Sequence, residues 1–221
     1  MNNNMENRKL LKDTEFLVID FETITPKGRP PEPIEVGIIR IKQNEIDRTA
    51  TVSCLIKPPE GLHLTQFDIA QTGIKEQDLI GKQSAEQVMR KINNSCKKKE
   101  YVFMAQNARY EANILSHYTD KFPAIAQTPI IDTILLAKHV LPQLPNYKLD
   151  TLAKAVGEDI PPDRYRALAD CVLTAKVYLK LIELQKKKRN IEYLEELLQI
   201  AEIQTSYNKP QQLELFDFFD R

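Results

Sequence analysis

Short apolar runs separated by polar connections dominate the first third of the chain. Residues 16–19 (Phe-Leu-Val-Ile) are all apolar, and beyond a proline- and glycine-rich segment at 26–33 apolar side chains recur from Ile34 to Ile41. Short runs rich in β-branched and aromatic residues are typical of strands. The pattern predicts a hairpin whose two strands are joined by a long loop.

A third β-like stretch covers residues 51–56 and ends at Pro58-Pro59. The chain then stays polar up to residues 84–87 (Ser-Ala-Glu-Gln), where a serine three residues before a glutamine is the pattern of a capping box. We therefore expect a helix to begin there. The lysines at 97–99 would end this helix favourably for its dipole.

The second half of the chain has a different pattern. Residues 102–105 (Val-Phe-Met-Ala) are apolar throughout, as in a strand buried on both faces, and a helical pattern follows through residues 112–115. Ile130-Ile131 repeats the step from strand to helix, and from Leu149 onward the apolar spacing is helical. The order is a β-meander, then alternating α and β elements, then helices, which predicts one α/β domain with a tail.

Composition limits the class of protein only loosely. The 221 residues, 42% of them hydrophobic, suffice for one substantial core, and 31 basic residues balance 31 acidic ones. Overall charge therefore does not indicate a nucleic-acid partner, although a local basic groove is compatible with it. Three widely spaced cysteines fit a reducing compartment, and no apolar stretch approaches the roughly eighteen residues of a membrane helix. We expect a soluble, cytoplasmic protein that does not bind a membrane.

Acidic residues provide the first candidate chemistry. Asp20 and Glu22 follow the first predicted strand, where a period of two places both side chains on one face. Two such carboxylates repel each other, and a divalent cation with hard oxygen ligands removes the repulsion. The plainer interpretation is a solvated strand end. Two more acids can converge on this pair: Glu111, after the second buried strand, and Asp170, on a helix expected to begin near Arg164.

Three segments carry these acids: Val-Ile-Asp-Phe-Glu-Thr at 18–23, Gln-Asn-Ala-Arg-Tyr-Glu at 106–111 and Tyr-Arg-Ala-Leu-Ala-Asp at 165–170. In this order they resemble the three motifs of the DEDD (DnaQ-like) 3′–5′ exonuclease superfamily, which includes the proofreading epsilon subunit of bacterial DNA polymerase III. Smaller matches lie at residues 34–37, 71–74, 132–133 and 148–153. Several motifs in the right order are far more specific than any one of them.

The resemblance covers about residues 14–185. It implies an α/β, ribonuclease H-like fold with a mixed five-stranded sheet flanked by helices. We accordingly divide the chain into an N-terminal extension (1–13), an exonuclease domain (14–186) and a C-terminal helix and tail (187–221).

In this superfamily two Mg²⁺ or Mn²⁺ ions clamp the scissile phosphate, one activating a water and the other stabilising the leaving 3′ oxygen. The resemblance implies that these ions are held by Asp20, Glu22, Glu111 and Asp170, with Asp20 bridging both. It also implies substrate contacts from a second set of residues: Phe21, Thr23, Thr72 and Asn107.

Two positions depart from the superfamily's pattern. The second motif usually ends in aspartate, and Glu111 must change its rotamer, shift its helix or bind through a water to replace it. The third motif usually has a histidine five residues before its aspartate, or in a sister branch a tyrosine four residues before. Here Tyr165 stands five residues before Asp170. On a helix, a one-residue offset turns a side chain by roughly 100°, so the sister geometry is not inherited.

Tyr165 is a weaker general base than histidine at neutral pH, although it can orient a water, and packing of its ring at the helix entrance is the alternative. We predict reduced rather than absent activity. The three histidines of the chain, His63, His117 and His139, are expected to be surface or packing residues.

The C-terminal end is apolar after a charged helical segment at 190–204. Residues 212–216 (Gln-Leu-Glu-Leu-Phe) resemble the motif by which bacterial polymerases and repair proteins bind the sliding clamp. Gln212 would bond at the pocket rim and Leu213 would pack beside it, while Leu215 and Phe216 fill an apolar pocket. Docking of this segment on its own domain is the alternative.

The leading interpretation is a metal-dependent 3′–5′ exonuclease that removes nucleoside monophosphates from DNA 3′ ends in proofreading or repair, tethered by the clamp and with a DNA polymerase as a further partner. One rival is a catalytically lapsed adaptor that binds nucleic acid and the clamp, with Glu111 and Tyr165 as signs of lost chemistry. Another is an RNA-trimming exonuclease. Metal binding and substrate assays discriminate among the three.

Overall fold

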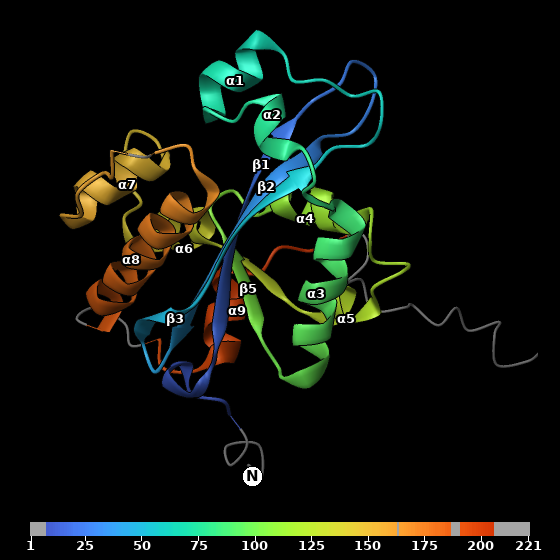
Figure 1. Ribbon diagram of the computed structural model, residues 1–221. Helices are drawn as coiled ribbons and strands as arrows, with labels where there is room; N and C mark the ends of the chain where they lie inside the picture. Colours follow the sequence, from blue (N-terminus) through green and yellow to red (C-terminus); the bar gives the residue numbers. More distant parts are fainter. Residues whose placement is uncertain (1–7, 163, 187–190, 206–221) are drawn as a thin grey trace, which may run out of the picture.

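A mixed β-sheet with helices on both faces forms the centre of the molecule (Figure 1). The computed structural model describes residues 8–162, 164–186 and 191–205 of the 221-residue chain. The α/β class expected from the alternation of apolar patterns is confirmed.

The first three strands form the predicted β-meander. β1 (Phe16–Ile24) and β2 (Glu32–Lys42) pair antiparallel, with residues 25–31 as the expected long loop. β3 (Glu45–Lys57) pairs antiparallel with β2 and begins well before residue 51, where the sequence pattern placed its start. Its added first half is largely polar, so backbone pairing with β2, not an apolar pattern, extends the strand.

The later strands complete the sheet by parallel pairing. β5 (Val102–Ala105) pairs with β1, β6 (Ile130–Asp132) pairs with β5, and β5 is buried at every position, as predicted. The short β4 (Gln83–Ser84) pairs with the end of β3, which gives the order β4-β3-β2-β1-β5-β6. The sheet thus has six strands rather than the expected five, because a two-residue strand is too short to leave a hydrophobic period in the sequence.

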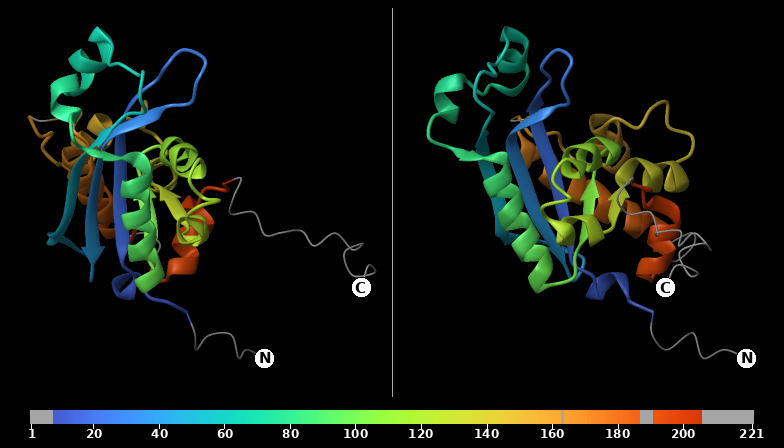
Figure 2. Two further views of the ribbon diagram at one scale, coloured as in Figure 1. Left: turned by 45° about the vertical axis from the view of Figure 1, so that its right-hand side comes forward. Right: turned by 90° about the vertical axis from the view of Figure 1, so that its right-hand side faces the viewer.

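One 3₁₀ helix and nine α-helices occur in the described residues: η1 (Leu11–Asp13), α1 (Gln66–Thr72), α2 (Glu76–Leu79), α3 (Ala85–Lys98), α4 (Arg109–Ser116), α5 (Pro123–Gln127), α6 (Thr133–Val140), α7 (Leu149–Val156), α8 (Ala167–Lys186) and α9 (Leu194–Ala201). Helices α6 to α9 lie on one face of the sheet and α3 to α5 on the other (Figure 2). Alternate residues of β1 serve the two cores, with Val18 on the α8 side and Ile19 on the α3 side. This alternation decides which face receives the acids of β1.

The capping box predicted for α3 is present. The Ser84 hydroxyl accepts from the Gln87 N–H at 3.3 Å, and the Gln87 side chain accepts from the Ser84 N–H at 2.9 Å. The two short helices α1 and α2 were not predicted, because their segment is polar and mostly exposed. A capping box between Thr65 and Asp68 marks the start of α1 and is the signal that could have revealed it.

Segments on either side of the predicted exonuclease domain pack against it. Leu11, Ile191 and Leu197 belong to the core on the α8 face, and the Ile203 N–H donates to the Ile130 carbonyl at 3.1 Å. The domain boundaries at 13/14 and 186/187 stay predictions. The expected clamp-binding residues lie outside the described part of the chain: Gln212, Leu213, Leu215 and Phe216. None of the described helices is both long and apolar enough to cross a membrane.

Candidate active site

Asp20 and Glu22 lie near the end of β1, on the face covered by α8, as the period of two predicts. A register shift between β1 and β2 follows directly after Glu22. Phe21, between them, faces the other core and is 4% exposed. Its ring therefore packs in the core, and the substrate contact that the resemblance implies for Phe21 stays a prediction.

A buried carboxylate on β2 anchors the N-terminus of α8. Glu35 is 1% exposed and accepts from both Nη2 and Nε of Arg166, at 2.7 and 3.1 Å, and from the Ala167 N–H at 3.3 Å. A bidentate guanidinium and a helix N-terminus are strong partners for a buried anion. This contact sets the position of α8 over β1 and thus the place of Asp170, in the first turn of the helix.

Gly37 allows the helix to lie directly on the sheet. It pairs with Asp20 across the hairpin, and a Cβ at this position would lie 2.3 Å from the carbonyl carbon of Ala167. The Cys171 thiol donates to the Gly37 carbonyl at 3.2 Å. Only a residue without a side chain permits this approach, which brings Asp170 up to Asp20.

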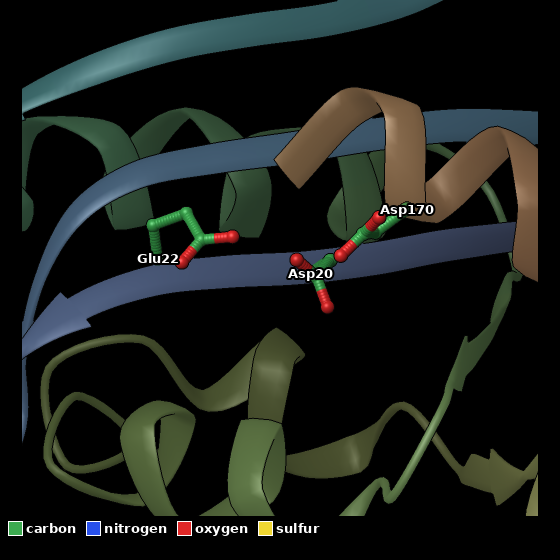
Figure 3. A group of neighbouring side chains, drawn as sticks. All are labelled: Asp20, Glu22 and Asp170. Carbon is green, nitrogen blue, oxygen red and sulfur yellow. The ribbon is translucent and has the colours of Figure 1, made fainter. Parts of the chain in front are cut away.

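Asp20, Glu22 and Asp170 form one cluster, in which a carboxylate oxygen from each lies within 4.8 Å of the other two. Figure 3 shows the two carboxylates of β1 and that of α8 turned toward one another. Burial, followed by repulsion from neighbouring carboxylates, raises the pKa of Asp20 to about 7 and that of Glu22 to about 8. Burial also raises the pKa of Asp170, although Arg164 opposes the rise. The cluster is therefore costly to ionise without a cation.

Glu111 lies close to this cluster but outside it. It is 3% exposed in the first turn of α4, and burial, followed by the charge of Asp20, raises its pKa well above the usual range. It is not among the acids whose oxygens lie within 4.8 Å of one another. Within the described residues three acids converge this closely, and the role of Glu111 as a fourth metal ligand stays a prediction.

The carboxylate oxygens of the cluster and of the neighbouring Glu111 suit a hard divalent cation. Asp170 Oδ1 and Glu111 Oε2 are buried and have no hydrogen-bond partner among the described residues. Buried polar oxygens normally have a partner, and carboxylate oxygens are the ligands that Mg²⁺ and Mn²⁺ prefer. The residues present therefore fit the divalent ions that the three motifs imply.

Sequence reasoning did not single out Arg164, which lies beside the cluster. Its Nε donates to Asp150 Oδ1 at 2.8 Å, and its Nη1 forms a short contact with Asp170 Oδ2. Its positive charge opposes the rise in the pKa of both Asp20 and Glu22. The signal in the sequence is a basic residue six positions before an expected metal ligand.

Tyr165 lies in a turn ahead of α8, since the helix begins at Ala167 and not near Arg164 as expected. Its φ is +71°, its side chain is half exposed, and the Arg164 guanidinium lies 4.9 Å from its ring centroid. A comparison of helical positions four and five residues before Asp170 therefore does not apply to it. The ring is accessible to solvent rather than packed into the helix entrance.

The remaining predicted substrate residues differ in their accessibility. The hydroxyl of Thr23 bonds to that of Tyr110 at 2.5 Å, which ties the end of β1 to α4. Thr72 is buried, and its hydroxyl bonds the Asp68 carbonyl and the Ile74 N–H within α1 and the turn after it. Its hydroxyl is thus engaged by the backbone, a structural role that the resemblance did not indicate.

Asn107 occupies a strained position after β5. Its φ is +64°, and its backbone N–H donates to Asp132 Oδ1 at 3.2 Å, while its side chain is exposed. Asp132 also caps α6 through the Ile134 N–H at 2.8 Å. The side chain of Asn107 is therefore exposed on a backbone that is held in place, and its contact with a substrate stays a prediction.

Clusters of carboxylates that hold divalent ions occur in phosphatases, polymerases and nucleases, and the acids at the end of the central strand form a cluster of this kind. The model of the exonuclease family matches residues 17–178, and the chain belongs to this family. A PolC-type DNA polymerase III of Thermotoga maritima is 32% identical over 186 residues, which are 83% of this chain but 13% of that polymerase. The chain therefore spans about an eighth of the length of this relative.

Solved structures share the fold at lower identity. The nuclease domain of 3′hExo, a DEDDh family member bound to rAMP, has a TM-score of 0.67 and 19% identity, covering 78% of this chain and 93% of that one. Exonuclease I of E. coli in complex with a dT13 oligonucleotide has a TM-score of 0.67 and 17% identity, covering 79% and 42%. These structures confirm the ribonuclease H-like fold, and the match to the exonuclease family model confirms the resemblance to exonucleases.

Proposed function

We propose that this protein is a metal-dependent 3′–5′ exonuclease that removes nucleoside monophosphates from DNA ends in replication proofreading or repair. The observation that supports it most is the cluster of Asp20, Glu22 and Asp170, in which a carboxylate oxygen from each lies within 4.8 Å of the others in a chain of the exonuclease family. Buried carboxylates that lack a cation are unfavourable, so their convergence indicates a site built for one.

When bound, two divalent ions supply an activated water and charge stabilisation at the leaving 3′ oxygen. In this proposal Asp20, Glu22 and Asp170 hold them, and Glu111 contributes from outside the cluster. Tyr165 replaces the usual histidine and can orient a water from its exposed turn. Because tyrosine is a poor general base at neutral pH, we expect turnover slower than that of a histidine-containing relative.

DNA is the proposed substrate, and RNA is the alternative. Among the similar proteins, one is a DNA polymerase and another is an exonuclease in complex with a DNA oligonucleotide, whereas 3′hExo was solved with rAMP. The similarity to the polymerase covers most of this chain at 32% identity, and this favours DNA. Parallel assays on matched DNA and RNA oligonucleotides decide between them.

The direct test is shortening of 5′-labelled single-stranded and 3′-recessed DNA with Mg²⁺ or Mn²⁺. The wild type should release nucleoside monophosphates from the 3′ end. Asp20→Asn removes one charge without changing size, and should lower the rate about a thousandfold, because metal ions contribute several kcal/mol to stabilisation of the transition state.

Asp120→Asn is the matched control for this test. Asp120 is exposed in the turn that follows α4, so the same exchange there should leave the rate within about twofold of wild type. Equal rates for wild type and Asp20→Asn would contradict the proposed site. Absence of shortening on both DNA and RNA would favour the adaptor that binds nucleic acid without cleaving it.

We further propose that residues 212–216 bind the sliding clamp, on the support of their sequence pattern alone. Exchange of Leu215 and Phe216 to alanine should weaken binding of purified clamp at least about tenfold, because apolar anchors carry most of the energy of such contacts. Surface plasmon resonance with full-length protein measures this. Asp217→Asn/Asp220→Asn is the control, and equal affinity of the alanine variant and wild type would refute the clamp assignment.

A DNA polymerase as a further partner, and a cytoplasmic location, belong to the same proposal. The similarity to one segment of a PolC-type polymerase supports the first. Co-purification of a tagged full-length chain with a polymerase from native cells would test it.

A further inference from the structure

Arg164 links two acids from different helices at the edge of the acidic cluster. It contacts Asp150 at the start of α7 and Asp170 in α8, and its side chain is 17% exposed. A guanidinium that bonds two carboxylates on different helices is held in place from two directions. Its position is therefore fixed relative to Asp170.

This pairing makes the two oxygens of Asp170 unequal. Oδ2 accepts from the Arg164 guanidinium, whereas Oδ1 is buried and has no hydrogen-bond partner among the described residues. An oxygen that a guanidinium occupies is a poor ligand for a cation. Asp170 can therefore offer one oxygen to a metal ion while Arg164 keeps the other.

Charge acts in the same direction. The cluster combines three carboxylates, and Arg164 places one fixed positive charge next to one of them. A first divalent ion bound by Asp20, Glu22 and Asp170 Oδ1, together with the Arg164 guanidinium, balances the charge of the three carboxylates. A second ion near Asp170 would meet both the first ion and the guanidinium, and this repulsion is weakly screened in a buried site.

We infer that Arg164 is a positioning residue that controls how many divalent ions this site binds. It orients Asp170 for a first ion and opposes the binding of a second. The second ion binds only when the guanidinium releases Asp170. The inference rests on the proposed metal site. In addition to the two-ion scheme, the second ion binds more weakly because it competes with the Arg164 guanidinium for Asp170.

The inference is tested by titrating the full-length, EDTA-treated protein with Mn²⁺. Binding is measured by calorimetry and by the electron paramagnetic resonance signal of free Mn²⁺, so no activity assay is needed. Wild type should bind one ion tightly and a second at least about tenfold more weakly. Arg164→Gln should bind the second ion about tenfold more tightly than wild type does. Arg164→Lys keeps the charge and should stay within about threefold of wild type.

Arg40→Gln is the matched control. Arg40 also bonds two carboxylates, those of Asp47 and Glu15, but its strand position belongs to the opposite face of the sheet. Its loss should leave both Mn²⁺ affinities unchanged. If Arg164→Gln does not fold, Arg164→Met, which also removes the positive charge beside Asp170, should tighten the second ion in the same direction.

The outcomes separate this inference from the proposed function. If wild type binds Mn²⁺ but Arg164→Gln binds the second ion no more tightly than wild type does, the inference is overturned and the proposed function is not. The same holds if Arg164→Lys and Arg164→Gln have identical Mn²⁺ affinities. If wild type binds no more Mn²⁺ than Asp20→Asn does, both the inference and the proposed metal-dependent nuclease are overturned.

Discussion

The metal-free protein should lose stability as the pH rises from about 5 to about 8, the reverse of the usual behaviour of buried carboxylates in ion pairs. Burial and mutual repulsion raise the pKa of Asp20 from 3.8 to about 7 and that of Glu22 from 4.5 to about 8. In this range the native state therefore holds protons that the unfolded chain has released. Each proton must be given up against burial and repulsion as the pH rises.

The sign and size of the effect follow from these shifts. Stability from a raised carboxyl pKa is fully present below the unfolded value and is lost as the pH passes through the folded value. Between about pH 5 and about pH 8 the folding equilibrium shifts roughly a hundredfold through Asp20 and somewhat more through Glu22, so at about 1.4 kcal/mol for each factor of ten the free energy of unfolding should fall by roughly 6 kcal/mol. Urea unfolding in EDTA at several pH values measures this fall.

Two controls identify the groups responsible. The double variant Asp20→Asn/Glu22→Gln cannot ionise at these positions, so its stability should fall less than that of wild type between about pH 5 and about pH 8, by the part that Glu111 and Asp170 contribute. Saturating Mn²⁺ should likewise remove the fall in wild type, because the ion stabilises the ionised carboxylates. Flat stability of the EDTA-treated wild type would contradict the prediction, and a fall of equal size in the double variant would assign it to other groups.

Gly37→Ala should destabilise the protein by about 3 kcal/mol or more, although it adds only one methyl group. The new Cβ would lie 2.3 Å from the Ala167 carbonyl carbon and 2.4 Å from the Leu168 nitrogen. Both are backbone atoms of the first turn of α8, so no side-chain rotation relieves the overlap. The helix must move away from β2, and Asp170 moves with it.

The same variant tests whether the sheet positions the metal site. Any Gly37→Ala protein that folds should bind Mn²⁺ about tenfold or more weakly than wild type, since ligand positions tolerate only small errors. Gly28→Ala is the control: nothing lies within 4 Å of its added Cβ, and its φ of +73° makes it sensitive only to local strain. Wild-type stability and Mn²⁺ affinity in Gly37→Ala would show that α8 is not held by this contact.

The sequence alone determined the parts of the fold that have a local cause. The hairpin, the capping box of α3 and the buried β5 follow from apolar periods and capping residues, which act over a few positions. The position of Asp20 and Glu22 on one face follows because successive side chains of a strand point to opposite faces of the sheet. The ordered motifs were specific enough to indicate the family, which the comparison confirmed.

Only the tertiary structure decided which acids meet and what surrounds them. Asp170 reaches Asp20 because Glu35 anchors α8 and Gly37 admits it, and these contacts join residues more than a hundred positions apart. The same packing brings Arg164 to Asp170 and leaves Glu111 outside the three-acid cluster. No period in a sequence encodes such contacts, because they depend on how whole elements pack and on burial that raises carboxyl pKa values only once the core has closed.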